Sequence, residues 1–246
     1  MIKLENYEVV GWEHALRGMR NPHNSWANSD SAFKGVAQTD ILGDDDKVYK
    51  QDVYFDALNI GEKDHNRMMN LSKGGPVHAK YRRMIVVYVD ITAPLYWWKE
   101  FDTYKVGTVA NSCSTIHKIA DKEFTIEDFS CEHLWRVDQS IEDYLDDHDK
   151  EAHWNVQNPM HVMDIIIGTL NYYREDFIKT NDKKSWHQMI QLLPSSYNQK
   201  RTVMLNYEVL ANIYKWRKDH KLTEWHDVCS WIKTLPYSEV ITGGIE

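Results

Sequence analysis

The spacing of apolar and polar residues divides the chain into predicted strands and helices. Residues 1–10 are predicted to form a first strand, and the stretch MIVVYVDI, which begins at Met84, is the clearest strand of the sequence. Its β-branched and mostly apolar residues are typical of a strand that is buried on at least one face. Apolar residues three or four positions apart predict helices in the longer segments. These segments are 11–19, 61–72, 95–104, 159–180, 183–193, 202–225 and a last one over about 223–235.

Polar and turn-forming residues separate these elements. The segment NPHNSWANSDSAF is predicted to be a loop, and so is VGTVANSCSTIHK, which leads into another element. In the acidic segment DILGDDDKVYKQD, the three adjacent aspartates are interpreted as a solvated turn rather than a metal site, because three adjacent carboxylates do not converge on one metal ion without partners. Residues 123–155 are acidic and irregular. The chain has no internal repeat and no dividing linker, so we expect one α+β domain over residues 1–246.

The helix predicted to contain residues 206–225 carries two polar side chains on its apolar face. With about 100° of rotation per residue, Val209, Leu210 and Ile213 form one stripe, which begins at Asn206. Arg217 lies about three turns further on and enters the same stripe. A buried arginine is costly unless it meets an anion or several acceptors. Two interpretations stay open: the stripe faces a pocket for a phosphate or carboxylate, or Arg217 extends toward solvent near the helix end while Asn206 bonds a neighbouring loop.

Composition and charge indicate an ordered protein with a substantial core. Hydrophobic residues make up 42% and charged residues 27% of the 246 residues, so disorder is not expected. The formal net charge is −8 without a block of Lys and Arg, which argues against general binding of a nucleic-acid polymer but permits a local basic pocket. The chain has 10 tryptophans and 14 tyrosines, whose rings fill cores, stack on planar ligands and build interfaces.

The cysteines and the apolar segments bear on the compartment. Cys113, Cys131 and Cys229 are odd in number and far apart, so neither a disulfide framework nor a zinc spacing follows, and a reducing cytoplasm is the simplest location. The N-terminal MIKLENYEVV lacks the apolar run of a signal peptide. The most apolar stretch, MIVVYVDITAPLYWW, is interrupted by Asp90 and Pro94. We therefore expect a soluble, cytoplasmic protein that does not enter a membrane.

Common motifs of catalysis and metal binding are absent from the sequence. There is no GxGxxG after a strand, no GxxxxGK[ST], no GxSxG and no HExxH. The histidines lack metal-ligand spacing, since His148 and His153 are five residues apart, so no metal site is expected. Cys113 lies in the small-residue loop NSCST, but nothing in the sequence fixes a base beside it. The catalytic residues, if there are any, stay unknown from sequence.

Three segments together match the pattern of one enzyme family. ALRGM follows the first predicted strand, TAPLYWWKEFDTYKVGT joins a strand to a helix through Ala-Pro, and LPSSYNQKRTVMLN leads to Asn206. The helix after it then carries Asn212 and Arg217. In these segments the chain resembles the flavin-dependent thymidylate synthases, also called thymidylate synthase complementing proteins. Those enzymes have an Ala-Arg pair after the first strand, an Ala-Pro before the motif RHRxxxxNExSxRY, and the same interval from Leu-Pro to the helix asparagine.

The resemblance implies a fold, cofactors and an assembly. It covers most of residues 1–236, and residues 120–158 are interpreted as an insertion. It implies a single α+β domain of the ThyX type, with a central, mostly antiparallel sheet flanked by helices. Enzymes of the family use FAD and methylenetetrahydrofolate to convert dUMP into dTMP, at sites between the subunits of a homotetramer. The resemblance therefore implies FAD, a folate if the protein is active, a pyrimidine nucleotide such as dUMP, and a homotetramer.

The sequence departs from the family at the positions of the arginines in the family's motifs. Without a gap, the RHR element falls on Thr103, Tyr104 and Lys105, and the NExSxRY element falls near ANSCSTI, which lacks the Glu and the Arg. The arginine expected after Leu-Pro is Lys200, with Arg201 beside it. Lysine does not replace arginine where a bidentate contact is needed. Because FAD carries the hydride, these changes remove clamps that align the ligands rather than a nucleophile.

The candidate site residues follow from these matches. In the family, the asparagine that matches Asn212 lies at the flavin and the arginine that matches Arg217 lies at the nucleotide. One inserted residue would align Asn111 and Ser114 with the motif's Asn and Ser. The predicted nucleotide-binding residues are Lys105, Ser112, Ser114, Lys200, Arg201 and Arg217. The predicted cofactor-binding residues are Tyr104, Asn111, Asn206 and Asn212.

Two further groups of residues have open alternatives. The rings of Tyr96, Trp97 and Trp98 either stack on a base or flavin, or pack a helix at a subunit contact. Arg82 and Arg83 precede the central strand and point to opposite faces of any strand, so at most one of them faces a pocket.

Three functions are compatible with the sequence. The first is a nucleotide-binding protein with a thymidylate synthase-like fold that senses or sequesters a nucleotide, as a phage protein does against nucleotide signals. The second is a divergent FAD-dependent methyltransferase, a flavoprotein that acts on dUMP or a related pyrimidine nucleotide. The third is a structural role without a ligand. The changed arginine motif weighs against the second, and the helix with Asn206, Asn212 and Arg217 weighs against the third, so nucleotide binding without standard dTMP synthesis is the leading hypothesis.

Overall fold

The structure, a computed structural model, describes residues 2–33, 35–42, 48–55, 59–135 and 158–243. The chain forms two compact units, each assembled from segments that are distant in sequence. Unit 1 consists of Met1–Glu5, Asp90–Thr103 and Ala110–Thr202. Unit 2 consists of Asn6–Val89, Tyr104–Val109 and Val203–Glu246. The expectation of one domain over residues 1–246 stays a prediction.

The regular elements of the described residues are a mixture of strands and helices along the chain. The strands are β1 (Lys3–Val10), β2 (Gly35–Leu42), β3 (Val48–Phe55), β4 (Val86–Pro94), β5 (Val109–Ser112) and β6 (Asn198–Asn206). The helices are α1 (Trp12–Arg20), α2 (Glu62–Lys73), α3 (Leu95–Phe101), α4 (Thr115–Lys118), α6 (Pro159–Thr180), α7 (Lys183–Leu192), α8 (Tyr207–Arg217), α9 (Glu224–Thr234) and α10 (Glu239–Thr242). Short 3-10 turns are η1 (Asn21–His23), η2 (Trp26–Asn28), η3 (Lys80–Met84), η4 (Asp102–Tyr104) and η5 (Ile126–Asp128).

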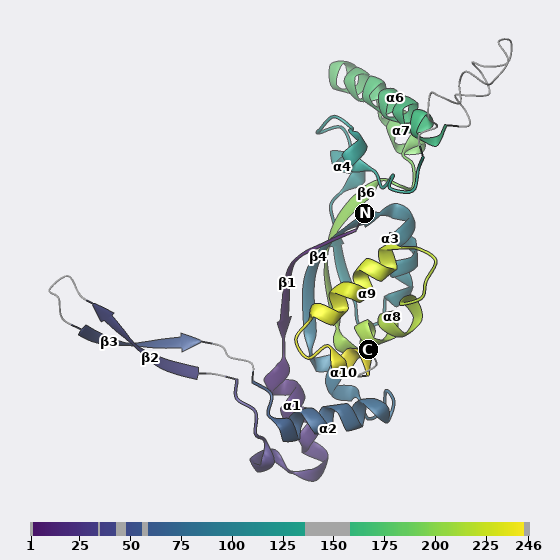
Figure 1. The fold of residues 1–246 in the computed structure, drawn as a ribbon. Helices are drawn as coiled ribbons and strands as arrows, with labels where there is room; N and C mark the ends of the chain where they lie inside the picture. The colour runs from purple at the N-terminus through teal and green to yellow at the C-terminus, as the bar shows by residue number, and fades with distance from the viewer. Residues whose placement is uncertain (1, 34, 43–47, 56–58, 136–157, 244–246) are drawn as a thin grey trace. The chain divides into compact units, whose positions relative to one another are not determined.

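The main sheet confirms the predicted α+β class with an antiparallel sheet. Its strands lie in the order β1-β4-β6-β5, and Figure 1 labels β1, β4 and β6 among them. The clearest predicted strand is β4, in which Val87, Val89, Ile91 and Ala93 are buried at every second position. This period of two puts the buried side chains on one face of the strand. No helix of the described residues is long and apolar enough to cross a membrane.

A hairpin that the sequence analysis did not predict follows the first helix. Strands β2 and β3 pair antiparallel from Gly35↔Phe55 to Leu42↔Val48. The two ends of the segment DILGDDDKVYKQD belong to β2 and β3, and its three aspartates at 44–46, which were interpreted as a solvated turn, lie outside the described residues. The β-branched and aromatic residues of VYKQDVYF favour a strand, and the acidic residues obscured that signal. At the base of the hairpin, Ala32 and Asn59 exchange backbone hydrogen bonds of 2.8 and 2.9 Å.

The predicted loop that begins at Asn21 is fixed by one buried carboxylate. The side chain of Asp64, on α2, is fully buried and accepts hydrogen bonds from Arg20 Nε at 2.6 Å, Ser29 Oγ at 2.5 Å and Ser31 Oγ at 2.7 Å. A buried charge of this kind is tolerable only when it is paired and hydrogen-bonded. The loop is thus ordered by its own polar residues and by the helices on either side of it.

The predicted helix over 202–225 is wrong at both of its ends. The strand β6 extends to Asn206, and within it Val203 and Leu205 are buried while Thr202 is exposed, which is the alternation of a strand. The helix α8 begins only at Tyr207 and ends at Arg217, and α9 is a separate helix. The predicted helices that correspond to α1, α2, α3, α6, α7 and α9 are confirmed.

Unit 1 has its own core around α6 and α7, which pack side by side (Figure 1). Its central side chains are Ile119, Phe124, Phe129, Met163, Leu170 and Met189. Trp97 and Trp98 of α3 are also fully buried in this unit, and Trp98 Nε1 donates to Gln199 O at 2.9 Å. These two rings are therefore core side chains. The strand β5 lies inside the segment 106–118 that was predicted as a loop, and residues 136–157 of the predicted insertion lie outside the described residues.

Candidate functional site

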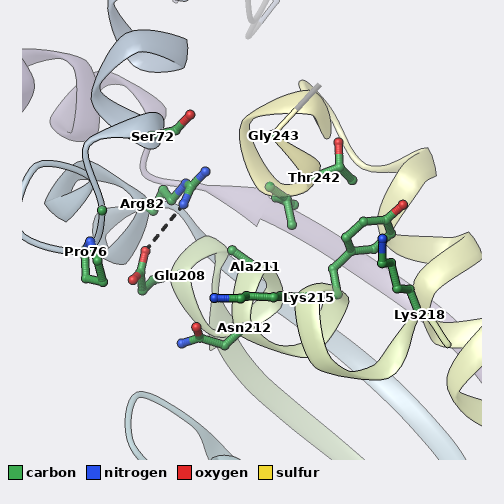
Figure 2. Close-up of a pocket in the computed structure, with 13 residues that line it drawn as sticks. Ser72, Pro76, Arg82, Glu208, Ala211, Asn212, Lys215, Lys218, Thr242 and Gly243 are labelled. Atoms are coloured by element: carbon green, nitrogen blue, oxygen red, sulfur yellow. Dashed lines mark ion pairs between the residues drawn. The ribbon is translucent and has the colours of Figure 1, made fainter. Parts of the chain in front are cut away.

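Unit 2 contains a cavity of about 380 Å³ beside helix α8. The helix offers it Glu208, Ala211, Asn212, Lys215 and Lys218, which recur at the three- and four-residue spacing of one helix face. The end of α2 and the turn after it form a second wall with Ser72, Gly75 and Pro76, and the end of α10 forms a third with Ile241, Thr242 and Gly243 (Figure 2). The apolar face of α8, with Val209, Leu210 and Ile213, is buried in the opposite direction. The cavity thus lies on the polar side of an amphipathic helix.

The charged side chains of this cavity are mostly cationic. Among the described residues that line it, Arg82, Lys215 and Lys218 are cationic and Glu208 is the acidic member. Figure 2 shows the Lys215 side chain extending toward Asn212 and Glu208. The Lys215 ammonium also lies 5.0 Å from the centre of the Trp216 ring. This balance of charge favours an anionic ligand.

Arg82 is held in a fixed position at the back of the cavity. It lies in η3 just before β4, and its Nη2 donates to the backbone oxygen of Val240. The neighbouring Tyr81 donates its hydroxyl to Met68 O at 2.8 Å, and burial raises the pKa of Tyr81 to about 12. Of the two arginines before β4, Arg82 is buried and faces the cavity while Arg83 is exposed. The expectation that at most one of them faces a pocket is met. The two arginines are neighbours in a 3-10 turn, however, and not in a strand.

Arg217 lies on another face of α8, in an aromatic environment. Its Nε donates to Tyr104 Oη at 3.0 Å. Its guanidinium carbon lies 4.8 Å from the centre of the Trp225 ring and 5.6 Å from that of Tyr104. Both contacts have the geometry of cation–π interactions. Five residues separate Asn212 from Arg217, which turns them about 140° apart on a helix, so these two predicted ligand contacts face different surroundings.

Asn206 is the N-cap of α8. Its Oδ1 accepts from the backbone N–H groups of Glu208 and Val209, each at 3.1 Å. Gly107 lies against the same side chain, since a Cβ added there would be 3.1 Å from Asn206 Nδ2. The backbone of Gly107 has a φ of +82°, which favours glycine. The carboxamide oxygen of Asn206 is therefore engaged in starting the helix.

Lys200 and Arg201, on β6, have acidic partners within unit 1. Lys200 Nζ lies 3.2 Å from Asp90 Oδ2 and 3.8 Å from Glu5 Oε2, and the hydrogen bond with Asp90 raises the pKa of Lys200. Arg201 Nη1 donates to Asp102 Oδ1 at 3.0 Å, and the guanidinium lies 4.1 Å above the Trp98 ring. Both cations already interact with groups of their own chain.

The remaining predicted residues are on the surface of the unit to which they belong. Ser114 is the N-cap of α4 and accepts from His117 N at 3.1 Å. Asn111 and Ser112 are exposed on β5, and Lys105 is exposed just after η4. The predicted nucleotide- and cofactor-binding residues therefore divide between the units: Asn111, Ser112, Ser114, Lys200 and Arg201 belong to unit 1, and Tyr104, Lys105, Asn206, Asn212 and Arg217 belong to unit 2.

Of the ten predicted residues, Asn212 lines the cavity of unit 2. Sequence analysis missed Glu208, Lys215 and Lys218, which share its helix face. Glu208 and Lys215 are four and three residues from Asn212, and Lys218 is three residues beyond Lys215, so this helix face was visible in the sequence. The apolar stripe on the other side of the helix gave the stronger signal.

Solved structures with a similar fold are known, although no family model and no curated protein matches the chain. Thymidylate Synthase X (ThyX) from Helicobacter pylori, with FAD and dUMP, is similar with a TM-score of 0.57 and 14% identity over 97% of this chain and 94% of that one. The UMP/dUMP methylase PolB from Streptomyces cacaoi, bound with 5-Br dUMP, has a TM-score of 0.58 and 11% identity over 100% and 95% of the two chains. Bound with 5-Br UMP, PolB gives 0.57 and 11% over 98% and 94%. The chain therefore has a ThyX-like fold, which confirms the fold that the resemblance implied.

Proposed function

We propose that this protein binds a pyrimidine nucleoside monophosphate in the cavity of unit 2 and is not a standard dTMP synthase. The observation that carries the proposal is the cavity itself, in which Asn212 stands with Arg82, Lys215 and Lys218. Proteins of the same fold have been solved with dUMP and with bromo derivatives of dUMP and UMP. A role in sequestering or sensing a nucleotide requires only that the protein binds the nucleotide and does not require that it converts it.

Charge and size both support a nucleotide as the ligand. A phosphate monoester carries about −1.5 to −2 charge at neutral pH. Lys215 on α8 and Lys218 at its C-cap are exposed, so such a group can reach both of them from solvent. The volume of about 380 Å³ falls in the range of roughly 300–1,000 Å³ that is usual for small-molecule sites. The amide of Asn212 offers both donors and an acceptor to a base or sugar.

A divergent FAD-dependent methyltransferase is the second candidate, favoured by the likeness to a ThyX solved with FAD and dUMP. The residues of unit 2 that were assigned to the flavin do not fit one flavin surface within that unit. Asn206 caps α8, Tyr104 accepts from Arg217, and Asn212 lies on the cavity face. We therefore place the binding function first. FAD, folate, a homotetramer, a cytoplasmic location and a phage origin stay predictions.

Binding of UMP and dUMP to the full chain, measured by isothermal titration calorimetry, tests the proposal. We expect the double variant Lys215→Ala/Lys218→Ala to bind either nucleotide at least about tenfold more weakly, because hydrogen bonds to charged groups contribute about 1.5–3 kcal/mol. The matched control is Lys221→Ala, which removes an exposed lysine that does not line the cavity. Affinity that is absent in the wild type, or equal in the double variant and the control, would contradict the proposal.

An absorption spectrum from about 300 to 550 nm, with added FAD and then dUMP, separates the two candidates. A nucleotide-binding protein without redox chemistry gives no bound-flavin spectrum at any FAD concentration. Bound flavin that is bleached by NADPH and responds to dUMP would favour the enzyme.

A further inference from the structure

Arg82 and Glu208 form an incomplete ion pair in the wall of the cavity. Arg82 Nη1 and Glu208 Oε2 are 3.9 Å apart, which is beyond hydrogen-bond distance. Within the described part of the chain, Arg82 Nε and Glu208 Oε2 are buried polar atoms without a hydrogen-bond partner. Leaving such atoms unpaired is unfavourable, and it is more so when they are charged. The pair can therefore make two further hydrogen bonds: Arg82 can donate one and Glu208 can accept one.

A single hydroxyl group fits this capacity. A hydroxyl both donates and accepts, so one oxygen can donate to Glu208 and accept from Arg82. Arg82 Nη1 and Glu208 Oε2 are 3.9 Å apart, so with hydrogen bonds of about 2.8 Å to each they subtend ~90° at that oxygen, which is compatible with its bonding directions. The side chains of Arg82 and Glu208 are only 10% and 13% exposed, so a one-atom group reaches them more readily than the edge of a ring.

The charges of the cavity indicate which end of a nucleotide lies here. The Glu208 carboxylate repels a phosphate, whereas Lys215 and Lys218 attract it. A phosphate held by the lysines leaves the sugar to face the Arg82–Glu208 pair. In other nucleotide sites, an acidic side chain binds a ribose hydroxyl in the same way.

We propose that Arg82 and Glu208 bind the 2′-hydroxyl of the ribose, and that the cavity therefore prefers ribonucleotides to deoxyribonucleotides. The inference rests on the proposed nucleotide-binding function and names the sugar that the same cavity takes. Arg82 is suited to the role because its Nη2 bond to Val240 O fixes it before the ligand arrives. The 2′-hydroxyl is also the group by which proteins distinguish RNA from DNA.

Sugar analogues test this with the wild-type chain, by calorimetry with UMP, dUMP and the arabinose epimer of UMP. We expect UMP to bind roughly tenfold to a hundredfold more tightly than dUMP, since its hydroxyl meets two charged groups. The epimer carries the hydroxyl on the other face of the sugar and is expected to bind like dUMP. Equal affinities for UMP and dUMP, or for UMP and the epimer, would overturn the inference.

The variant Glu208→Ala removes the acceptor and is expected to bring the UMP-to-dUMP affinity ratio to within about twofold of one. The control is Lys221→Ala, which removes an exposed side chain outside the cavity and leaves the ratio unchanged. If Glu208→Ala does not fold, Glu208→Gln keeps the size of the side chain and is expected to lower the ratio by loss of the charge. An unchanged ratio in both Glu208 variants overturns the inference.

The two proposals fail in different ways. If neither nucleotide binds the wild type, the nucleotide-binding function itself is wrong. If both bind equally and both depend on Lys215 and Lys218, the function stands and the assignment of Arg82 and Glu208 to the ribose is wrong.

Discussion

At the scale of single residues, Arg217 illustrates how a helix can end in a cation that is held by aromatic rings. The ring of Trp225 and the ring and hydroxyl of Tyr104 both contact the guanidinium. Tyr104 and Trp225 also contact each other edge to face, with ring centres 6.0 Å apart. This arrangement joins the end of α8, the start of α9 and the segment after α3 within unit 2.

The variant Arg217→Ala is therefore expected to lower the free energy of unfolding by about 1–3 kcal/mol, from the loss of one hydrogen bond and two cation–π contacts. Urea denaturation measures this change. Arg217→Lys, which keeps the charge but loses the planar contacts, is the control. Its free energy of unfolding should lie between those of the wild type and Arg217→Ala. Arg217 does not line the cavity, so we expect the UMP affinity of Arg217→Ala to fall less than about threefold. A threefold fall corresponds to about 0.7 kcal/mol. A larger fall would support the nucleotide-binding role that the sequence assigns to Arg217.

Tyr81 predicts a stability change at alkaline pH. Its pKa is raised by burial from 10.0 to about 12, so the folded state holds the proton more tightly than the unfolded state. This contribution is fully present below pH 10 and is lost as the pH rises through 12, with a limit of about 2–3 kcal/mol at 1.36 kcal/mol per unit. The unfolding free energy of the wild type, measured by urea denaturation from pH 9 to 12, should fall more steeply than that of Tyr81→Phe. Parallel curves would contradict the prediction.

At the scale of elements, the junction of β6 and α8 depends on one side chain. Asn206 is the last residue of the strand and the N-cap of the helix, with its Oδ1 bonded to two backbone N–H groups. We expect Asn206→Ala to lower the unfolding free energy by about 1 kcal/mol, within the usual 0.5–2 kcal/mol of a lost cap. Asn206→Asp keeps the cap and should lose much less, and Asn212→Ala, on the exposed face, serves as the control. Thermal unfolding that is the same for Asn206→Ala and Asn212→Ala would show that the cap is unimportant.

The helices were predictable from sequence and the weaker strands were not. Helices such as α6 and α7 have a sustained spacing of apolar residues, and the structure has them at 159–180 and 183–192. The strand β6 was mistaken for the start of a helix because Val203 and Leu205 precede an apolar stripe of different period. The hairpin β2–β3 was missed because its pairing is non-local and its polar residues also suit a turn.

The candidate site was less predictable than the fold. A resemblance in spacing identified Asn212, which lines the cavity, but Asn206 and Arg217 share an apolar stripe for different reasons, a cap and an aromatic contact. Arg82 is more than 120 residues from α8 in the chain. Its proximity to Glu208 is set by tertiary packing, which a single sequence does not reveal.

At the scale of the whole molecule, the net charge separates a nucleotide from a nucleic acid as ligand. The chain has a formal net charge of −8, while the cavity concentrates Arg82, Lys215 and Lys218 in one place. A polyanion meets mostly repulsion over such a surface, whereas a mononucleotide meets only the local field. We expect no retention of single-stranded RNA or DNA at about 0.15 M salt, where the Debye length is about 8 Å. A fluorescence anisotropy titration with a labelled oligonucleotide measures this, and micromolar binding would contradict it.

The ThyX-like fold leaves the activity open, because one fold supports different functions through its sites. The similar solved proteins are only 11–14% identical to this chain. At that distance the side chains around a cavity are free to differ while the arrangement of strands and helices persists.

The base of the β2–β3 hairpin has a consequence for which changes the fold tolerates. Ala32 and Asn59 already join the two chain segments that flank the hairpin, and Asp64 fixes the residues just before it. The hairpin is therefore a removable module: its length and sequence can change, or a short turn can replace it, without reopening the core. A closed base of this kind lets evolution, or protein engineering, exchange one appendage for another on an unchanged scaffold.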